Sequence, residues 1–124
     1  MVKKCILIVE DEPDILALYK EYLEGAGFDI ETAVNGEEGF NKILEGNAQL
    51  VLLDIMMPKL DGIGILQLLK EGKHKLPTII MLTNLSHDNA LKEALDLGAK
   101  DCIIKSEVTP DKILEKVNSY LELT

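Results

Sequence analysis

The chain alternates between short apolar runs and longer segments in which apolar residues recur every three or four positions. The short runs are rich in Val, Ile and Leu and cover residues 5–9, 28–34, 50–53, 78–82 and 102–104. Runs of this length that are almost wholly apolar are typical of strands buried on both faces of a parallel sheet. The pattern therefore predicts five strands, each followed by a helix.

The first two predicted helices carry clear boundary signals. The first begins near Pro13 and ends within residues 25–27, which include two glycines. The second covers about residues 36–46, where Asn35 and Glu38 have the spacing of a capping box. The apolar positions expected to face the core are Ile15, Leu18, Tyr19, Tyr22, Leu23 and Ala26 in the first helix and Phe40, Ile43 and Leu44 in the second.

The other three helices are marked by capping residues and apolar stripes. The third is predicted over about residues 63–70. Ser86 is a candidate cap for the fourth helix, and Gly98 is placed to end it in a left-handed turn. The fifth has Thr109 as its cap and Pro110 as its first residue. Their apolar positions are Ile65, Leu66, Leu68 and Leu69 in the third helix, Ala90, Leu91, Ala94 and Leu95 in the fourth, and Ile113, Leu114, Val117, Tyr120 and Leu121 in the fifth.

This strict alternation of strands and helices predicts an α/β fold. Its parallel sheet would be doubly wound, covered by helices on both faces and joined by right-handed crossovers. The length of 124 residues is enough for one domain, and the chain contains no repeat, linker or low-complexity segment. We therefore expect a single domain over residues 1–124.

Charge and composition exclude several classes of protein. Thirteen Lys and Arg residues against 22 Asp and Glu residues give a net charge of −9, which opposes direct binding to nucleic acid. The apolar runs are far shorter than the roughly 20 residues that cross a bilayer, and the N-terminus lacks a signal-peptide pattern. We therefore expect a cytoplasmic protein that binds no membrane. Cys5 and Cys102 lie inside apolar runs and are expected to be reduced core thiols.

Polar side chains follow four of the five predicted strands. They are Glu10, Asp11 and Glu12 after the first strand, Asp54 after the third, Thr83 after the fourth and Lys105 after the fifth. In a doubly wound sheet, ligands bind beyond the carboxyl ends of the strands, at the point where the strand order reverses. The candidate functional site is therefore this edge of the sheet.

A cluster of carboxylates at one edge favours a bound cation. Two carboxylates about 4 Å apart repel each other by roughly 4 kcal/mol at an effective dielectric constant near 20. Carboxylate oxygens suit a hard divalent ion, and Mg²⁺ commonly combines one or two of them with water and phosphate oxygens. The charges of Glu10, Asp11, Asp54, Lys105 and one Mg²⁺ sum to zero.

Such a site suits phosphoryl transfer, because the transition state of that reaction is stabilised mainly by positioned cations and hydrogen-bond donors. If Asp54 attacked phosphorus, it would become an acyl phosphate, and its charge would change from −1 to about −2. Mg²⁺, the Lys105 ammonium and the Thr83 hydroxyl could then bind the added oxygens.

The chain resembles the receiver domains of response regulators in two-component signalling over essentially its whole length. The resemblance rests on five blocks in the expected order, which are residues 8–12 (IVEDE), 53–62 (LDIMMPKLDG), 81–83 (MLT), 97–101 (LGAKD) and 104–105 (IK). It implies a flavodoxin-like fold with the strand order 2-1-3-4-5. The first and last strands are not neighbours in that order, which argues further against a disulfide between Cys5 and Cys102.

The resemblance also implies a role for each site residue. Asp54 would accept a phosphoryl group from the phosphohistidine of a sensor histidine kinase or a phosphotransfer protein. Mg²⁺ would be held by the side chains of Glu10, Asp11 and Asp54 and by the backbone carbonyl of Met56. Thr83 and Lys105 would bind the phosphoryl oxygens. A shift of Thr83 would then pull the loop before the fourth helix inward.

Several positions depart from the family pattern. Cys102 stands where the family generally has a Tyr or Phe that rotates on activation, so the aromatic part of the switch is missing. Ser106 replaces the proline that commonly follows the lysine in a cis peptide bond, which predicts either a trans peptide with a rearranged loop or a strained cis one. Met56 and Leu85 are apolar, and we hypothesise that they shield the acyl phosphate from water.

Three functions agree with these residues. The first is a phosphorylation-controlled switch that signals to a downstream protein through its fourth helix, fifth strand and fifth helix, as a monomer or weak homodimer. Because no output domain follows Thr124 in this sequence, we expect signalling to pass through that surface, and either a stand-alone protein or an excised module fits. The second is a Mg²⁺-dependent aspartyl-phosphate phosphohydrolase, although such enzymes usually carry a second Asp where this chain has Met56. The third is an interaction domain that no longer switches.

Overall fold

The computed structural model describes residues 3–84 and 88–121, which form five strands, five α-helices and one 3₁₀ turn. The strands are β1 (Cys5–Val9), β2 (Asp29–Ala33), β3 (Leu50–Asp54), β4 (Thr78–Thr83) and β5 (Asp101–Ile104). The helices are α1 (Pro13–Gly25), α2 (Gly36–Glu45), α3 (Gly62–Glu71), α4 (Asp88–Asp96) and α5 (Pro110–Leu121), and the 3₁₀ turn is η1 (Lys105–Glu107). All five predicted strands and all five predicted helices are confirmed within a few residues.

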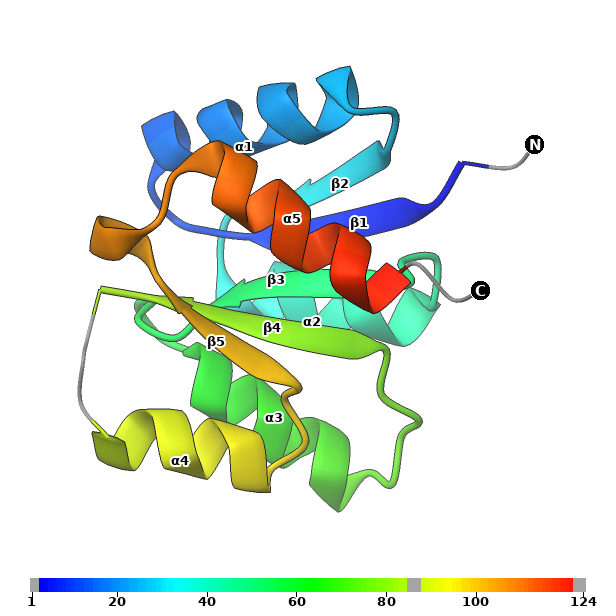
Figure 1. Cartoon of the computed structure of the whole chain (residues 1–124). Helices are drawn as coiled ribbons and strands as arrows, with labels where there is room; N and C mark the ends of the chain where they lie inside the picture. Colours follow the sequence, from blue (N-terminus) through cyan, green and yellow to red (C-terminus); the bar gives the residue numbers. More distant parts are fainter. Residues whose placement is uncertain (1–2, 85–87, 122–124) are drawn as a thin grey trace.

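The strands form one parallel sheet with the order β2-β1-β3-β4-β5, as the resemblance implied. Strand β1 lies between β2 and β3, so the order reverses direction there. The carboxyl ends of β1 and β3 therefore border the switch point at which this class of fold binds its ligands. Both ends lie at the left of Figure 1.

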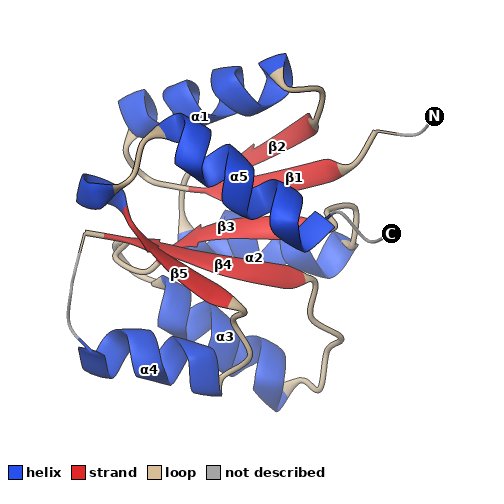
Figure 2. Ribbon diagram, viewed as in Figure 1, coloured by secondary structure: helices blue, strands red, loops and turns tan. Residues whose placement is uncertain are grey.

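Helices cover both faces of the sheet. Helices α1 and α5 pack on one face, while α2, α3 and α4 pack on the other (Figures 1 and 2). Side chains of β1 alternate between the two cores, with Leu7 and Val9 on the α2–α4 side and Ile6 and Ile8 on the α1–α5 side. All four are fully buried, which explains why the strand sequence is apolar throughout.

The apolar stripes predicted for the helices are wider than the faces that become buried. Tyr19 and Leu23 of α1 are buried, whereas Leu18 and Tyr22 are exposed, as is Ala26 just after the helix. Leu44 of α2 is also exposed, so its prediction as a core residue is wrong. Leu68 of α3 and Leu95 of α4, which belong to the apolar stripes of those helices, are exposed as well. Each helix meets the sheet along a narrow strip, and a residue one position away on a helix points about 100° from it.

The helix ends follow the predicted signals in most cases. The Asn35 side chain accepts a hydrogen bond from the Glu38 amide and caps α2. The Glu38 carboxylate, expected to complete a capping box, instead lies 3.5 Å from Lys42 Nζ. Gly98 has a φ of +116°, the left-handed turn predicted after α4. Ser86, the predicted cap of α4, lies outside the described residues.

The cysteines and the Lys105–Ser106 peptide settle three further predictions. Cys5 and Cys102 are free thiols, but both are half-buried rather than fully buried in the core. The Lys105–Ser106 bond is trans, like every described peptide bond, and the residues after β5 form the turn η1. Among the described residues, no helix is long and apolar enough to span a membrane.

Candidate functional site

The polar residues of the candidate site lie at the carboxyl ends of four parallel strands, at one edge of the sheet. Glu10 follows β1, Asp54 ends β3, Thr83 ends β4 and Lys105 follows β5. All five strands are parallel, so their carboxyl ends share this edge of the sheet. Glu10 and Thr83 are fully buried and Asp54 is 3% exposed, and these three are the buried polar residues of the described chain.

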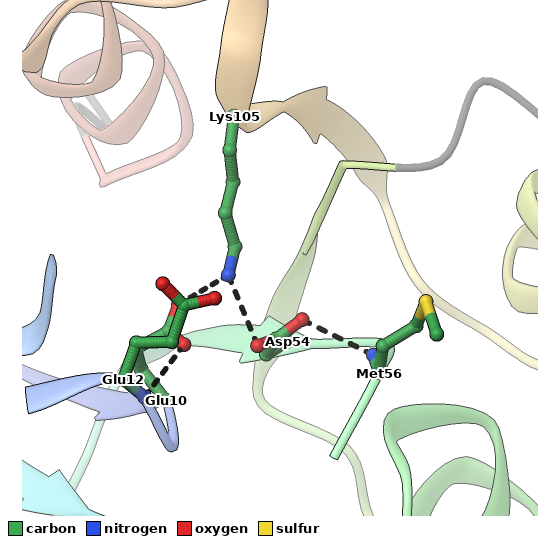
Figure 3. Close-up of polar contacts among 5 residues, drawn as sticks. All are labelled: Glu10, Glu12, Asp54, Met56 and Lys105. Carbon is green, nitrogen blue, oxygen red and sulfur yellow. Dashed lines mark hydrogen bonds and ion pairs between the residues drawn. The ribbon is translucent and has the colours of Figure 1, made fainter.

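The Lys105 ammonium bridges the two buried carboxylates (Figure 3). Its Nζ lies 2.5 Å from Glu10 Oε1 and 3.0 Å from Asp54 Oδ2, and the side chain of Lys105 is itself 5% exposed. A buried carboxylate is costly unless it is paired and hydrogen-bonded. Lys105 meets this requirement for both acids, although it lies 95 residues from Glu10 in the sequence.

Backbone amides hold the other oxygen of each carboxylate. The Met56 amide donates to Asp54 Oδ1 at 3.1 Å, and the Glu12 amide donates to Glu10 Oε2 at 3.1 Å. The side chain of Met56 points away from the carboxylates (Figure 3), and the residue is 57% exposed. Glu10 and Asp54 are therefore each oriented by one ammonium and one amide.

Glu10, Asp11 and Asp54 form a cluster that could hold a cation. Each of the three offers a carboxylate oxygen, and these oxygens all lie within 4.8 Å of one another. Glu10 and Asp54 are buried and Asp11 is partly exposed. Hard carboxylate oxygens on one open edge match the ligand chemistry of Mg²⁺, which retains several waters. The residues present therefore fit this ion.

The electrostatics of the cluster also favour an additional positive charge. Burial raises the pKa of Glu10 from its ordinary value of 4.5 to about 7, against the opposing effect of its hydrogen bond with Lys105. Burial alone would lower the pKa of Lys105, but its hydrogen bonds to Glu10 and Asp54 outweigh this effect and raise that pKa. Lys105 stays charged, and the net negative charge that remains on the carboxylates can be neutralised by a proton or by a metal ion.

The structure brings together the residues singled out from the sequence. Glu10, Asp11, Asp54 and Lys105 converge at one edge, and the Met56 backbone lies beside Asp54. Thr83 lies on β4, next to β3 in the sheet. Part of the loop that Thr83 would pull inward, including Leu85, lies outside the described residues.

The two backbone donors of the site could not be predicted from the sequence. The amides of Glu12 and Met56 orient the buried carboxylates, but every residue except proline carries an amide. Their roles depend on how the chain turns after β1 and β3. The sequence shows an acidic residue two positions after Glu10 and a short loop after Asp54. Neither feature predicts the direction in which a backbone amide points.

Comparison with known proteins identifies the family of the chain. The family model for the response regulator receiver domain matches residues 6–118. The chain belongs to this family. The transcriptional regulatory protein SrrA of Staphylococcus aureus is 40% identical over 119 residues, which are 96% of this chain and 48% of that protein. The chain thus spans about half the length of the curated relatives it matches.

Solved receiver domains share the fold closely. A CheY-like receiver domain protein from Methanospirillum hungatei is 33% identical, with a TM-score of 0.86 over 98% of this chain and 95% of that chain. A chain of the CheX–CheY–BeF3–Mg²⁺ complex from Borrelia burgdorferi is also 33% identical, with a TM-score of 0.83 over 94% of this chain and 88% of that one. This receiver domain is therefore a module of two-component signalling.

Proposed function

We propose that Asp54 accepts a phosphoryl group from the phosphohistidine of a sensor histidine kinase or phosphotransfer protein, and that the resulting acyl phosphate switches a protein-binding surface. The observation that supports this most directly is the buried Asp54 carboxylate, held 3.0 Å from Lys105 and beside two further acids. A purely structural ion pair would not need three clustered carboxylates at the switch point of the sheet.

In the proposed transfer, an oxygen of Asp54 attacks phosphorus while the bond between phosphorus and the histidine nitrogen breaks. The electron pair of that bond leaves with the imidazole, so the transfer needs no other reactant. The carboxylate carries about one extra negative charge as an acyl phosphate. Lys105, already within hydrogen-bond distance of Asp54, is placed to pair with a phosphoryl oxygen, and the Thr83 hydroxyl on the adjacent strand binds another.

Mg²⁺ belongs to the same proposal. The side chains of Glu10, Asp11 and Asp54 and the backbone carbonyl of Met56 would hold it, and the ion would supply positive charge to the phosphoryl oxygens. Support comes from the three clustered carboxylates, of which Glu10 and Asp54 are buried. The chain has Met56 at the position where aspartyl-phosphate phosphohydrolases usually carry a second Asp, so we favour a slow switch over a turnover enzyme.

We propose that the output surface consists of α4, β5 and α5. Strand β5 is an edge strand, so its free side and the two flanking helices are open to a protein partner. Cys102 on β5 replaces the usual aromatic residue, and a half-buried thiol cannot cover and uncover a pocket as a ring can. The output is therefore carried by the Thr83 loop and α4, in a monomer or a weak homodimer.

Labelling with acetyl phosphate tests the phosphoryl transfer. Wild-type protein incubated with acetyl phosphate and Mg²⁺ should gain the mass of one phosphoryl group, and Asp54→Asn should gain none. Asp96→Asn, which changes an exposed aspartate on α4, is the matched control and should label like wild type. Equal labelling of Asp54→Asn and wild type would contradict the proposal.

The switch is tested separately from the chemistry. Beryllofluoride with Mg²⁺ should shift amide signals beyond the site, into α4 and β5. Shifts restricted to the neighbours of Asp54 would instead support the interaction domain that no longer switches.

A further inference from the structure

The first residue of α2 lies against the backbone of the loop that follows Asp54. A Cβ atom at Gly36 would lie 1.8 Å from the Leu60 carbonyl oxygen, 2.7 Å from its carbonyl carbon and 2.8 Å from its Cβ. Nonbonded atoms do not approach so closely, and two of these three atoms belong to the backbone. Only glycine allows the two segments to be in contact here.

The α2 side of this contact is held in place. The Asn35 side chain caps the helix, and the Gly39 amide donates to the Asn35 carbonyl at 3.0 Å. One turn further on, a Cβ at Gly39 would lie 2.7 Å from Val9 Cγ1, so α2 also packs closely on β1. The cap and this hydrogen bond fix the first turn of α2 internally, and the helix cannot retreat from Leu60 without losing its packing on the sheet.

The loop side is held at both of its ends. The Ile55 amide donates to the Leu82 carbonyl at 2.9 Å, and the Gly62 amide donates to the Ile55 carbonyl at 3.0 Å. Between these points, Met57 is buried in the core and Lys59 adopts a left-handed φ of 70°. Contact with α2 therefore limits how far the part of the loop around Leu60 can move outward.

We propose that Gly36 is a positioning residue for the phosphorylation site. By admitting the Leu60 carbonyl, it fixes the loop of residues 55–61 so that the Met56 backbone faces Asp54. The Met56 amide already donates to Asp54 Oδ1 at 3.1 Å, and its carbonyl is the proposed fourth Mg²⁺ ligand. Gly36 itself takes no part in phosphoryl transfer or metal binding, and it acts only by holding the loop in position. This inference rests on the proposed function.

Replacing Gly36 tests the role, with Mg²⁺ affinity as the readout. Gly36→Ala must displace the loop, so its dissociation constant for Mg²⁺ should rise about tenfold or more, the range seen when residues that orient metal ligands are changed. The ¹⁵N-labelled protein is titrated with MgCl₂, and urea unfolding identifies conditions in which each variant is fully folded. The Met56 amide signal should also move in metal-free Gly36→Ala.

Two other glycines provide matched controls. A Cβ at Gly25, the last residue of α1, meets nothing within 4 Å. A Cβ at Gly64 also approaches Leu60, but at 2.8 Å from the flexible end of its side chain rather than from its backbone. Gly25→Ala and Gly64→Ala should keep the Mg²⁺ dissociation constant within about twofold of wild type, well below the tenfold effect of a displaced ligand.

The outcomes separate this inference from the proposed function. A folded Gly36→Ala with the Mg²⁺ affinity of Gly25→Ala, beside a wild type that binds Mg²⁺ and is phosphorylated, overturns the positioning role alone. A wild type that does neither overturns the proposed function. If Gly36→Ala does not fold, the wild-type titration decides: the Gly36 and Leu60 amides should shift with the same midpoint as Met56, and unchanged signals at both would refute the role.

Discussion

Lys105→Met isolates the contribution of the ammonium that joins the two buried acids. Methionine keeps most of the length and the apolar stem of lysine but removes the charge. In wild type, Nζ lies 3.0 Å from Asp54 Oδ2 and 2.5 Å from Glu10 Oε1. The substitution therefore leaves two carboxylates that are almost entirely buried without their cation.

The magnitude follows from two opposing effects. At an effective dielectric constant near 20, the Lys105–Asp54 pair at 3.0 Å and the Lys105–Glu10 pair at 2.5 Å each amount to roughly 5–7 kcal/mol of Coulomb energy before desolvation. Removing one partner of a buried pair typically costs about 3–5 kcal/mol. Protonation of Glu10 limits the loss, because its pKa is already about 7 with Lys105 present and rises further without it. We expect a loss of about 3 kcal/mol in the free energy of unfolding at pH 8.

The loss should depend on pH in a defined direction. The pKa of Glu10 in the folded variant lies further above its unfolded value than in wild type, so the variant loses stability as pH rises from the unfolded pKa through the folded one. The difference from wild type should therefore be smaller near pH 5 than at pH 8. Saturating Mg²⁺ at pH 8 should reduce it, since the ion supplies the missing positive charge.

Urea unfolding followed by circular dichroism, in EDTA and in Mg²⁺, measures these differences. Lys112→Met is the matched control, because the side chain of Lys112 is 65% exposed and its Nζ lies 3.7 Å from Glu115. That variant should lose less than about 1 kcal/mol, with no rise between pH 5 and pH 8. A Lys105→Met loss that is under about 1 kcal/mol, or independent of pH, would refute the reasoning.

Two further predictions concern the phosphate and the core. Met56→Asn should shorten the lifetime of phosphorylated Asp54, because an amide beside the acyl phosphate can hydrogen-bond an attacking water, whereas the thioether cannot. The lifetime is measured by intact mass as the phosphorylated species decays, and an unchanged lifetime would contradict the hypothesis that Met56 shields the acyl phosphate. Leu23→Ala should destabilise the protein by about 2–5 kcal/mol, since Leu23 is 1% exposed, whereas Leu18→Ala, at a position 51% exposed, should cost less than about 1 kcal/mol. Equal losses in the free energy of unfolding for the two variants, measured by urea unfolding, would show that Leu18 is also part of the core.

The architecture and the approximate place of the site follow from the amino-acid pattern alone. The apolar runs predict β1, β3 and β4, because a strand that is buried on both faces of a sheet has apolar residues at almost every position. The alternation with helices makes the sheet parallel, and the carboxyl ends of parallel strands share one edge. Glu10, Asp54 and Lys105 could therefore be assigned to one site from local position alone, and the structure confirms that they meet.

Which helix surfaces are buried and which backbone groups orient the site residues depends on how the elements pack together. Leu18 and Leu44 have the spacing of core residues yet lie outside the strips where α1 and α2 meet the sheet. The Met56 amide on Asp54 and the contact of Gly36 with the Leu60 carbonyl have no side-chain signature. Periodicity reports the direction of a side chain relative to its own helix, whereas these contacts depend on the distance between segments that the chain brings together only on folding.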